Sequence, residues 1–158
     1  MQTAYFLESN SAISPADAVA ALLVLEDGRY VMQLRDPKPE IFYPDHWGCF
    51  GGAVDPGERP LDALRRELSE ELNFQAGAAR EFTRFDFDFS RLGHAKVYRI
   101  FYEVSVTNEA FGRFELHEGA DMRAFEASEL LVGNRVTPYD AFAVWLHCSR
   151  HRFAGHGG

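Results

Sequence analysis

The chain has 158 residues, of which 46% are hydrophobic and 25% charged, as expected for one globular domain that buries its own core. Its 16 Lys and Arg against 24 Asp and Glu give a formal net charge of −8, which argues against a broad nucleic-acid-binding surface. Two distant cysteines, Cys49 and Cys148, do not suggest a disulfide framework, and no apolar run reaches membrane-spanning length. We therefore expect a cytoplasmic, single-domain protein that binds neither nucleic acid nor membrane, with about residues 1–16 and 151–158 at its periphery.

Near the start of the chain, two apolar stretches flank a tight turn. The stretches "AVAALLVL" (18–25) and "YVMQLR" (30–35) are typical of strands, and Asp27-Gly28 between them is a strong hairpin signal. The next segment, "DPKPEIFYPDH" (36–46), carries three prolines that lack a backbone donor, so it is predicted to be a loop. The aromatic residues of this loop suggest that it borders a site.

A glycine-rich strand and a helix are predicted next. "WGCFGGAV" (47–54) is typical of a short strand whose glycines allow sharp bends or close backbone approach. After the turn "DPGE" (55–58), Pro60 suits the first turn of a helix, and Asn73, which tolerates the left-handed conformation, is its predicted end. Between them the leucines recur at helical spacing: Leu61, Leu64, Leu68 and Leu72.

The second half of the chain alternates strands with helices. "FTRFDFDF" (82–89) and "HAKVYRIFYEVSV" (94–106) are predicted strands with a turn near Gly93. "ASELL" (127–131) predicts a short helix, and the segment 137–150 predicts a longer one that begins with an N-cap Thr and a first-position Pro. These elements predict one α/β domain in which helices enclose a mixed or mostly antiparallel sheet.

Three glutamates, Glu67, Glu70 and Glu71, fall within an arc of roughly 100° on the predicted helix, beside the leucine stripe. The alternative interpretation, a solvated helix face, predicts glutamates opposite the leucines. Like charges at this spacing repel one another, and the single guanidinium of Arg66 cannot neutralise three carboxylates. Hard cations such as Mg²⁺ take oxygen ligands and bridge carboxylates to substrate phosphates. The pattern therefore favours a divalent metal site.

The segment 52–74 resembles the signature of the Nudix hydrolase family, G-x5-E-x7-R-E-U-x-E-E-x-G-U, in which U is a bulky apolar residue. Asn73 departs from the signature, because the family has its second glycine there, and Phe50-Gly51-Gly52 stands where many members have Pro-Gly-Gly. Asn tolerates the left-handed helix end that this glycine is expected to supply. The matching residues are Gly52, Glu58, Arg66, Glu67, Leu68, Glu70, Glu71 and Phe74.

The resemblance implies a Nudix-type α/β/α sandwich with a mixed central sheet. It also implies an enzyme that depends on Mg²⁺ or Mn²⁺ and hydrolyses a phosphoric anhydride bond by attack of water on phosphorus. The expected substrate is a small anionic nucleoside diphosphate linked to another moiety: a nucleotide sugar, an ADP-ribose-like compound or a nucleoside triphosphate. The alternative is a Nudix-fold nucleotide-ligand sensor that has lost hydrolysis, against which the intact glutamates argue. Family analogy also implies a homodimer, and "TAYFLE" (3–8) is a candidate edge strand within the chain or towards a partner.

The resemblance further assigns roles to individual residues. Glu58 and Arg66 are expected to support catalysis by holding carboxylates in a fixed orientation. The general base stays open between Glu70 and two acids of a downstream loop, Glu118 and Asp121, since a loop acid can swing onto the site when substrate binds. The metal ligands implied by the resemblance are Gly52, Glu67, Glu70 and Glu71.

Four residues are predicted to contact substrate: Arg35, Phe42, Tyr43 and Trp47. Arg35 ends a strand directly before the proline-rich loop, a position suited to a phosphate contact. The alternating phenylalanines of segment 82–89 are interpreted as core, because one face of a strand usually packs inward. The final helix is likewise interpreted as a packing helix.

Overall fold

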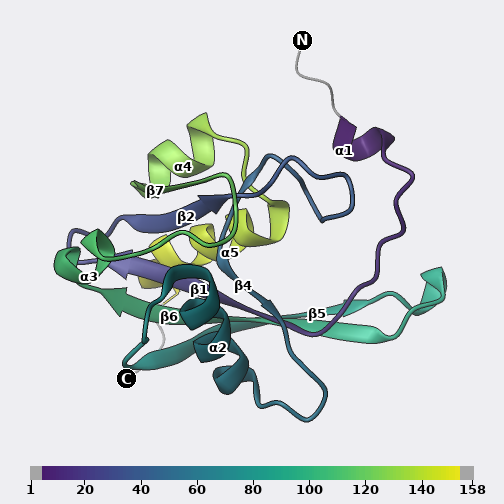
Figure 1. Cartoon of the computed structure of the whole chain (residues 1–158), viewed down its shortest axis with the longest axis horizontal. Helices are drawn as coiled ribbons and strands as arrows, with labels where there is room; N and C mark the ends of the chain where they lie inside the picture. The colour runs from purple at the N-terminus through teal and green to yellow at the C-terminus, as the bar shows by residue number, and fades with distance from the viewer. Residues whose placement is uncertain (1–4, 154–158) are drawn as a thin grey trace.

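The computed structural model describes residues 5–153 and contains a seven-stranded sheet with helices on both faces (Figure 1). The strands are β1 (Ala18–Leu25), β2 (Tyr30–Leu34), β3 (Trp47–Gly48), β4 (Phe50–Ala53), β5 (Ala79–Asp88), β6 (Lys96–Val106) and β7 (Asp121–Phe125). The helices are α1 (Tyr5–Glu8), α2 (Pro60–Leu72), α3 (Asn108–Gly112), α4 (Ala127–Gly133) and α5 (Pro138–Cys148), with short 3₁₀ turns η1 (Ser90–Leu92) and η2 (Arg150–Arg152). No helix in this part of the chain is long and apolar enough to cross a membrane.

Strand β1 is the centre of the sheet. It runs parallel to β6, from the pair Ala18 and Arg99 onward, and antiparallel to β2 and β4 on its other edge. Strand β5 extends the sheet beyond β6, while β3 and β7 both pair with β2. The sheet is therefore mixed, as predicted.

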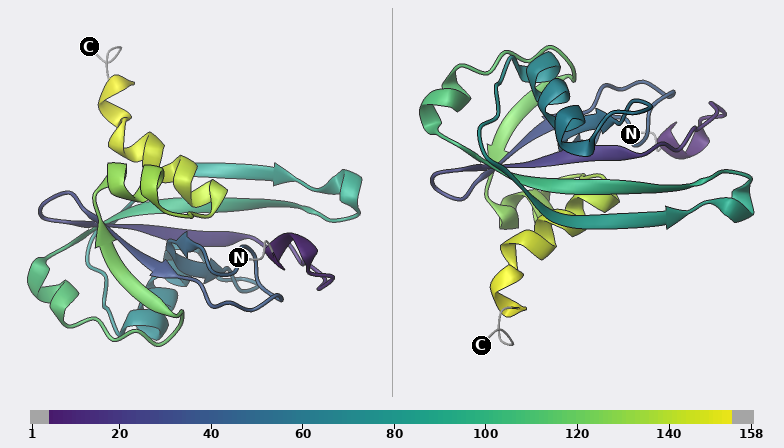
Figure 2. Two further views of the ribbon diagram at one scale, coloured as in Figure 1. Left: turned by 90° about the horizontal axis from the view of Figure 1, so that it is seen from above. Right: turned by 90° about the horizontal axis from the view of Figure 1, so that it is seen from below.

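The continuous apolar run of β1 is explained by burial on both faces of the sheet. Val19, Ala21 and Leu23 pack towards α2, whereas Ala20 and Leu22 pack towards α4 and α5. Figure 2 shows α2 on one face of the sheet and α5 on the other. Because strands alternate their side chains between the two faces, both sides of β1 must be apolar. The predicted α/β/α arrangement is confirmed.

Most predicted elements are confirmed, and two differ. The glycine-rich strand is divided at Cys49 into β3, which pairs with β2, and β4, which pairs with β1. Residues 5–8 of the candidate edge strand form the single helical turn α1, and residues 3–4 lie outside the described part of the chain. The final helix packs into the core through Ala143 and Val144, but its Phe142 and Trp145 side chains are 51% and 40% exposed.

Candidate functional site

The three signature glutamates of helix α2 differ in their exposure to solvent. Its leucines fill the core, so the residues that flank them on the helix surface lie at the boundary between core and solvent. Glu71 is only 3% exposed and the Glu67 side chain 14%, whereas the Glu70 side chain is 60% exposed. Two of the three glutamates therefore face the protein, which excludes a fully solvated helix face.

Strand β4 passes close to these two carboxylates. The Gly51 N–H donates to Glu71 Oε2 over 3.1 Å. A Cβ added to Gly52 would lie 2.5 Å from Glu67 Oε1, closer than any real side chain allows. Glycine is therefore required at position 52 for the strand backbone and the Glu67 carboxylate to approach each other.

Arg66 ties several signature residues together. Its Nε and Nη2 donate to the two carboxylate oxygens of Glu58 over 2.9 Å each, the paired geometry that suits a guanidinium and a carboxylate. Its Nη1 donates to Glu67 over 2.9 Å and to Glu70 over 3.4 Å, and its Nη2 also reaches the Ala53 carbonyl. The hydrogen bonds from Arg66 lower the pKa of Glu58 to about 2. Arg66 thus holds the carboxylate of Glu67 in a fixed orientation.

The structure brings one of the two loop acids to the glutamate cluster. Glu118 lies in the loop 113–120, and its negative charge acts on both Glu67 and Glu71. Asp121 is the first residue of β7, where it pairs with Leu34 in the sheet. Glu118 is therefore the loop acid that stands beside the buried glutamates.

The cluster carries a surplus of negative charge. Burial, and then the charges of Glu67 and Glu118, raise the pKa of the Glu71 carboxyl to about 9. Burial is also the largest cause of the raised pKa of Glu67. Arg66 contacts both Glu67 and Glu70. Among residues 5–153, no three His, Cys, Asp or Glu side chains are gathered tightly enough to hold a metal ion by themselves.

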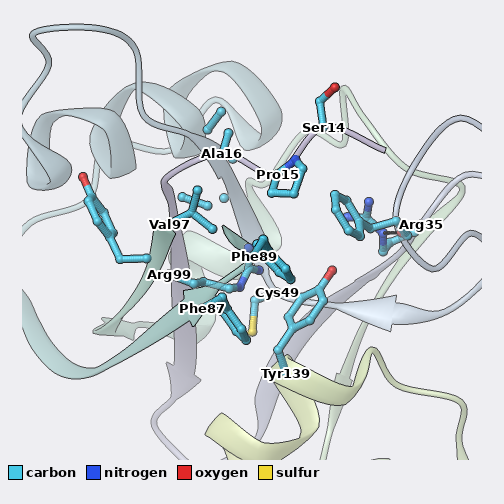
Figure 3. A pocket seen from close by; sticks show the side chains of 16 residues that line it. Ser14, Pro15, Ala16, Arg35, Cys49, Phe87, Phe89, Val97, Arg99 and Tyr139 are labelled. Carbon is cyan, nitrogen blue, oxygen red and sulfur yellow. Dashed lines mark hydrogen bonds between the residues drawn. The ribbon is translucent and has the colours of Figure 1, made fainter. Parts of the chain in front are cut away.

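A cavity of about 320 Å³ opens beside Gly51 and Gly52. In Figure 3 the side chains of Phe87, Phe89 and Tyr139 converge on it, and Arg99 reaches in from one wall. Aromatic faces and a few polar groups are typical of a small-molecule pocket. The lining residues are Ser14, Pro15, Ala16, Ala18, Arg35, Phe42, Cys49, Gly51, Gly52, Ala53, Phe87, Phe89, Val97, Tyr98, Arg99 and Tyr139.

Two of the four residues predicted to contact substrate line this cavity. Arg35 and Phe42 line it, and the Arg35 Nε donates to the Phe42 carbonyl over 2.7 Å. Tyr43 contacts the edge of the Tyr139 ring, with centroids 6.1 Å apart. Trp47 is not among the lining residues: it is buried, with its ring against Phe125 in the second core cluster.

Sequence reasoning assigned two lining residues to the core. Phe87 and Phe89 are half-buried and line the cavity, so the interpretation of the alternating phenylalanines as core is wrong for these two. Residues 14–16, expected at the periphery, also line it. Strand alternation reveals that the phenylalanines share a face, but not whether that face meets a helix or an open cavity.

Arg99, which lines the cavity, forms a buried ion pair with Asp140. The Asp140 carboxylate accepts hydrogen bonds from Arg99 Nη2 at 3.0 Å, Thr137 Oγ1 at 2.6 Å and the Cys49 N–H at 3.0 Å. The Arg99 guanidinium lies 4.7 Å from the centroid of the Tyr139 ring, as in a cation–π contact. This network attaches the first turn of α5 to β6 and to Cys49, the residue between β3 and β4.

Comparison with known proteins agrees with this geometry. Residues 14–146 match the family model of the NUDIX domain. The chain belongs to the Nudix family. The nucleoside triphosphatase NudI of Escherichia fergusonii is 46% identical to this Nudix chain over 50 residues, which are 32% of this chain and 35% of that protein. The match therefore spans about a third of the length of such relatives.

Solved Nudix structures share the fold over most of the chain. The MutT protein of Methanosarcina mazei Go1 superposes with a TM-score of 0.68 at 19% identity, covering 89% of this chain and 99% of that one. The NUDIX domain of Shewanella oneidensis NrtR, solved with ADP ribose, gives a TM-score of 0.66 at 16% identity and covers 98% and 100%. At these identities the likeness establishes the fold alone.

Proposed function

We propose that this Nudix protein is a metal-dependent pyrophosphohydrolase that cleaves a nucleoside diphosphate linked to another moiety. The observation that carries the proposal is the position of Glu67 and Glu71, which meet the glycine backbone of β4 at the edge of an aromatic cavity. One end of such a site suits phosphates held by a cation, and the other suits a nucleobase. Membership of the Nudix family supports the same reaction class.

The residues present fit Mg²⁺ or Mn²⁺. The raised pKa values of Glu67 and Glu71 reflect burial and the negative charges of neighbouring glutamates, both of which a cation offsets. Mg²⁺ in phosphate-transferring sites uses one or two protein carboxylates and completes its shell with water and substrate phosphates, so a full protein cage is not required. Glu67, Glu71, Glu70 and the Gly52 carbonyl are the proposed ligands. When bound, the ion polarises phosphoryl oxygens and lowers the pKa of water.

The remaining acids and Arg66 have separate proposed roles. Arg66 and Glu58 hold Glu67 in place through their paired hydrogen bonds. Glu118 is the proposed general base, because it stands beside Glu71, whereas the Glu70 side chain points mainly to solvent and contacts Arg66. In this role Glu118 accepts a proton from the attacking water.

The cavity is the proposed nucleobase pocket. Phe87 and Phe89 stack on each other with centroids 5.9 Å apart, and Tyr139 faces them from α5 (Figure 3). A planar base inserted between such rings gains stacking and loses its contact with water. Arg35, at the edge of the cavity beside Phe42, is placed to contact a substrate phosphate.

A substrate screen tests the proposal. The protein is incubated with nucleoside triphosphates, nucleotide sugars and ADP-ribose, with Mg²⁺, with Mn²⁺ and with chelator, and the products are analysed after reaction in ¹⁸O-labelled water. We expect turnover that requires the added metal, with label in one phosphate product that identifies the attacked phosphorus. Nucleotide binding without turnover of any compound would contradict the proposal and favour a ligand sensor.

A further inference from the structure

The loop that carries Glu118 is attached to the end of helix α2. The Glu115 N–H donates to the Leu72 carbonyl over 3.1 Å, and the His117 N–H donates to the Glu71 carbonyl over 2.8 Å. The His117 side chain adds a third contact, from Nδ1 to the Glu70 carbonyl over 2.9 Å. The last carbonyls of a helix have no partner within the helix, so these contacts satisfy groups that otherwise need water. His117 supplies two of the three.

A second attachment follows directly after Glu118. The Ala120 N–H donates to the Leu34 carbonyl at the end of β2 over 2.8 Å. Gly119 has a φ of +92°, and a Cβ there would lie 2.8 Å from Gln33 Oε1 and 3.0 Å from the Leu34 carbonyl oxygen. Glu118 is therefore held between an anchor on α2 and an anchor on β2.

The end of α2 is also a favourable place for such an anchor. The helix C-terminus is the end at which a histidine donor is most favourable.

We propose that His117 is a positioning residue that holds Glu118 against the glutamate cluster before substrate arrives. The inference rests on the proposed function only for the catalytic role of Glu118; the attachment itself rests on the hydrogen bonds. On this proposal Glu118 is already beside the glutamates before substrate binds, whereas the sequence led us to expect a loop acid that moves there on binding. His117 acts through its Nδ1–H and its backbone N–H and does not touch the reacting atoms.

Kinetics of His117→Ala provide the first test. Loss of the Nδ1 contact is expected to lower kcat about 10- to 100-fold with little change in KM, the range found when groups that orient catalytic residues are removed. His117→Asn, whose amide N–H can reach the same carbonyl, should restore most of kcat. His94→Ala, at the exposed turn between β5 and β6, is the matched control and should behave as wild type.

A double-mutant cycle separates positioning from general damage. In a Glu118→Gln background, His117→Ala is expected to have almost no further effect on kcat, because the group that it positions has already lost its function. An equal fold-loss in both backgrounds, or a normal kcat for His117→Ala alone, would overturn the proposal.

Amide hydrogen exchange tests the attachment without catalysis. His117→Ala should accelerate exchange in residues 113–120, while His94→Ala leaves that loop unchanged. If wild type turns over no substrate but the loop exchanges faster in His117→Ala, the proposed function fails and the attachment stands. Unchanged exchange in the loop would refute the attachment itself.

Discussion

Glu71 illustrates how a single residue departs from its ordinary behaviour in this fold. A glutamate on a helix surface is normally ionised and hydrated, but Glu71 is buried against the β4 backbone and its pKa is raised to about 9. Without a cation, its neutral form is therefore favoured near neutral pH. The residue is suited to binding a cation and contributes little to stability through its charge.

Glu71→Gln is predicted to separate activity from stability. The amide keeps the shape of the side chain and an oxygen that accepts from the Gly51 N–H, so the free energy of unfolding should change by less than about 1 kcal/mol. Turnover should fall about 100-fold or more, because a carboxylate ligand is lost from the reaction centre. Steady-state kinetics and urea unfolding measure the two effects.

Glu129→Gln, the same change on an exposed glutamate of α4, serves as the control. Near-normal turnover by Glu71→Gln would remove Glu71 from the set of metal ligands.

At the scale of elements, the contact of β4 with α2 and β1 requires two glycines for different reasons. Gly52 faces the end of the flexible Glu67 side chain. Gly51 has a φ of 149°, and its added Cβ would lie 2.1 Å from the Val19 carbonyl oxygen, a backbone atom of β1. Gly52 is therefore needed for the geometry of the site, and Gly51 for the pairing of the sheet.

The two glycines are predicted to respond differently to alanine. Gly52→Ala should retain the fold, because Glu67 can shift, and should lose activity about 10-fold or more. Gly51→Ala should be destabilised by several kcal/mol or fail to fold, because the backbone of β1 cannot yield without breaking its pairing with β4. Thermal unfolding and kinetics of both variants check this; equal losses of stability would contradict it.

The end of α2 yields a third prediction. Asn73 occupies the left-handed region at φ 52° and ψ 39°, and its backbone N–H donates to the Ser69 carbonyl. Asn73→Ala is expected to lower the free energy of unfolding by about 1 kcal/mol, whereas Asn73→Gly should be neutral or stabilising. Urea unfolding distinguishes the two, and a greater loss for glycine than for alanine would exclude the left-handed cap.

Most helices and strands could be predicted from the sequence, whereas the lining of the cavity could not. Leucine spacing and the signature located α2. The roles of Glu58 and Arg66 came from the family resemblance, whereas the helix stop at Asn73 followed from residue chemistry. Phe87 and Phe89 could not be assigned, because their exposure depends on where α5 begins. Phe85 stacks on Phe142 of α5, while the two later phenylalanines extend past the helix and border open space.

At the scale of the whole molecule, a buried polar cluster joins α5 to the face of the sheet opposite α2. His147 is 2% exposed; one of its ring nitrogens pairs with the Tyr30 hydroxyl and the other with Glu103. Burial lowers the pKa of His147 below its ordinary 6.5, and the hydrogen bond with His147 lowers that of Glu103 below its ordinary 4.5. Both groups therefore bind protons more readily in the unfolded chain.

Stability is predicted to depend on pH through this cluster. The free energy of unfolding should fall as the pH drops below about 6.5, where His147 of the unfolded chain takes up a proton, and again below about 4.5 for Glu103. Urea unfolding across this range measures the effect, and His147→Gln should remove the first decline. A wild-type stability that stays constant from about pH 7 to pH 5 would contradict the assignment.

The parallel pairing of β1 with β6 has a consequence for how the chain folds. The Asp17 side chain accepts from the Tyr98 N–H, 81 residues away, at the start of this pairing. Closing so long a segment is slow, and folding rates fall as contacts become more distant in sequence. Because β4 and α2 lie inside this segment, we expect refolding protein to regain helical signal first and catalytic competence only when its central strands meet.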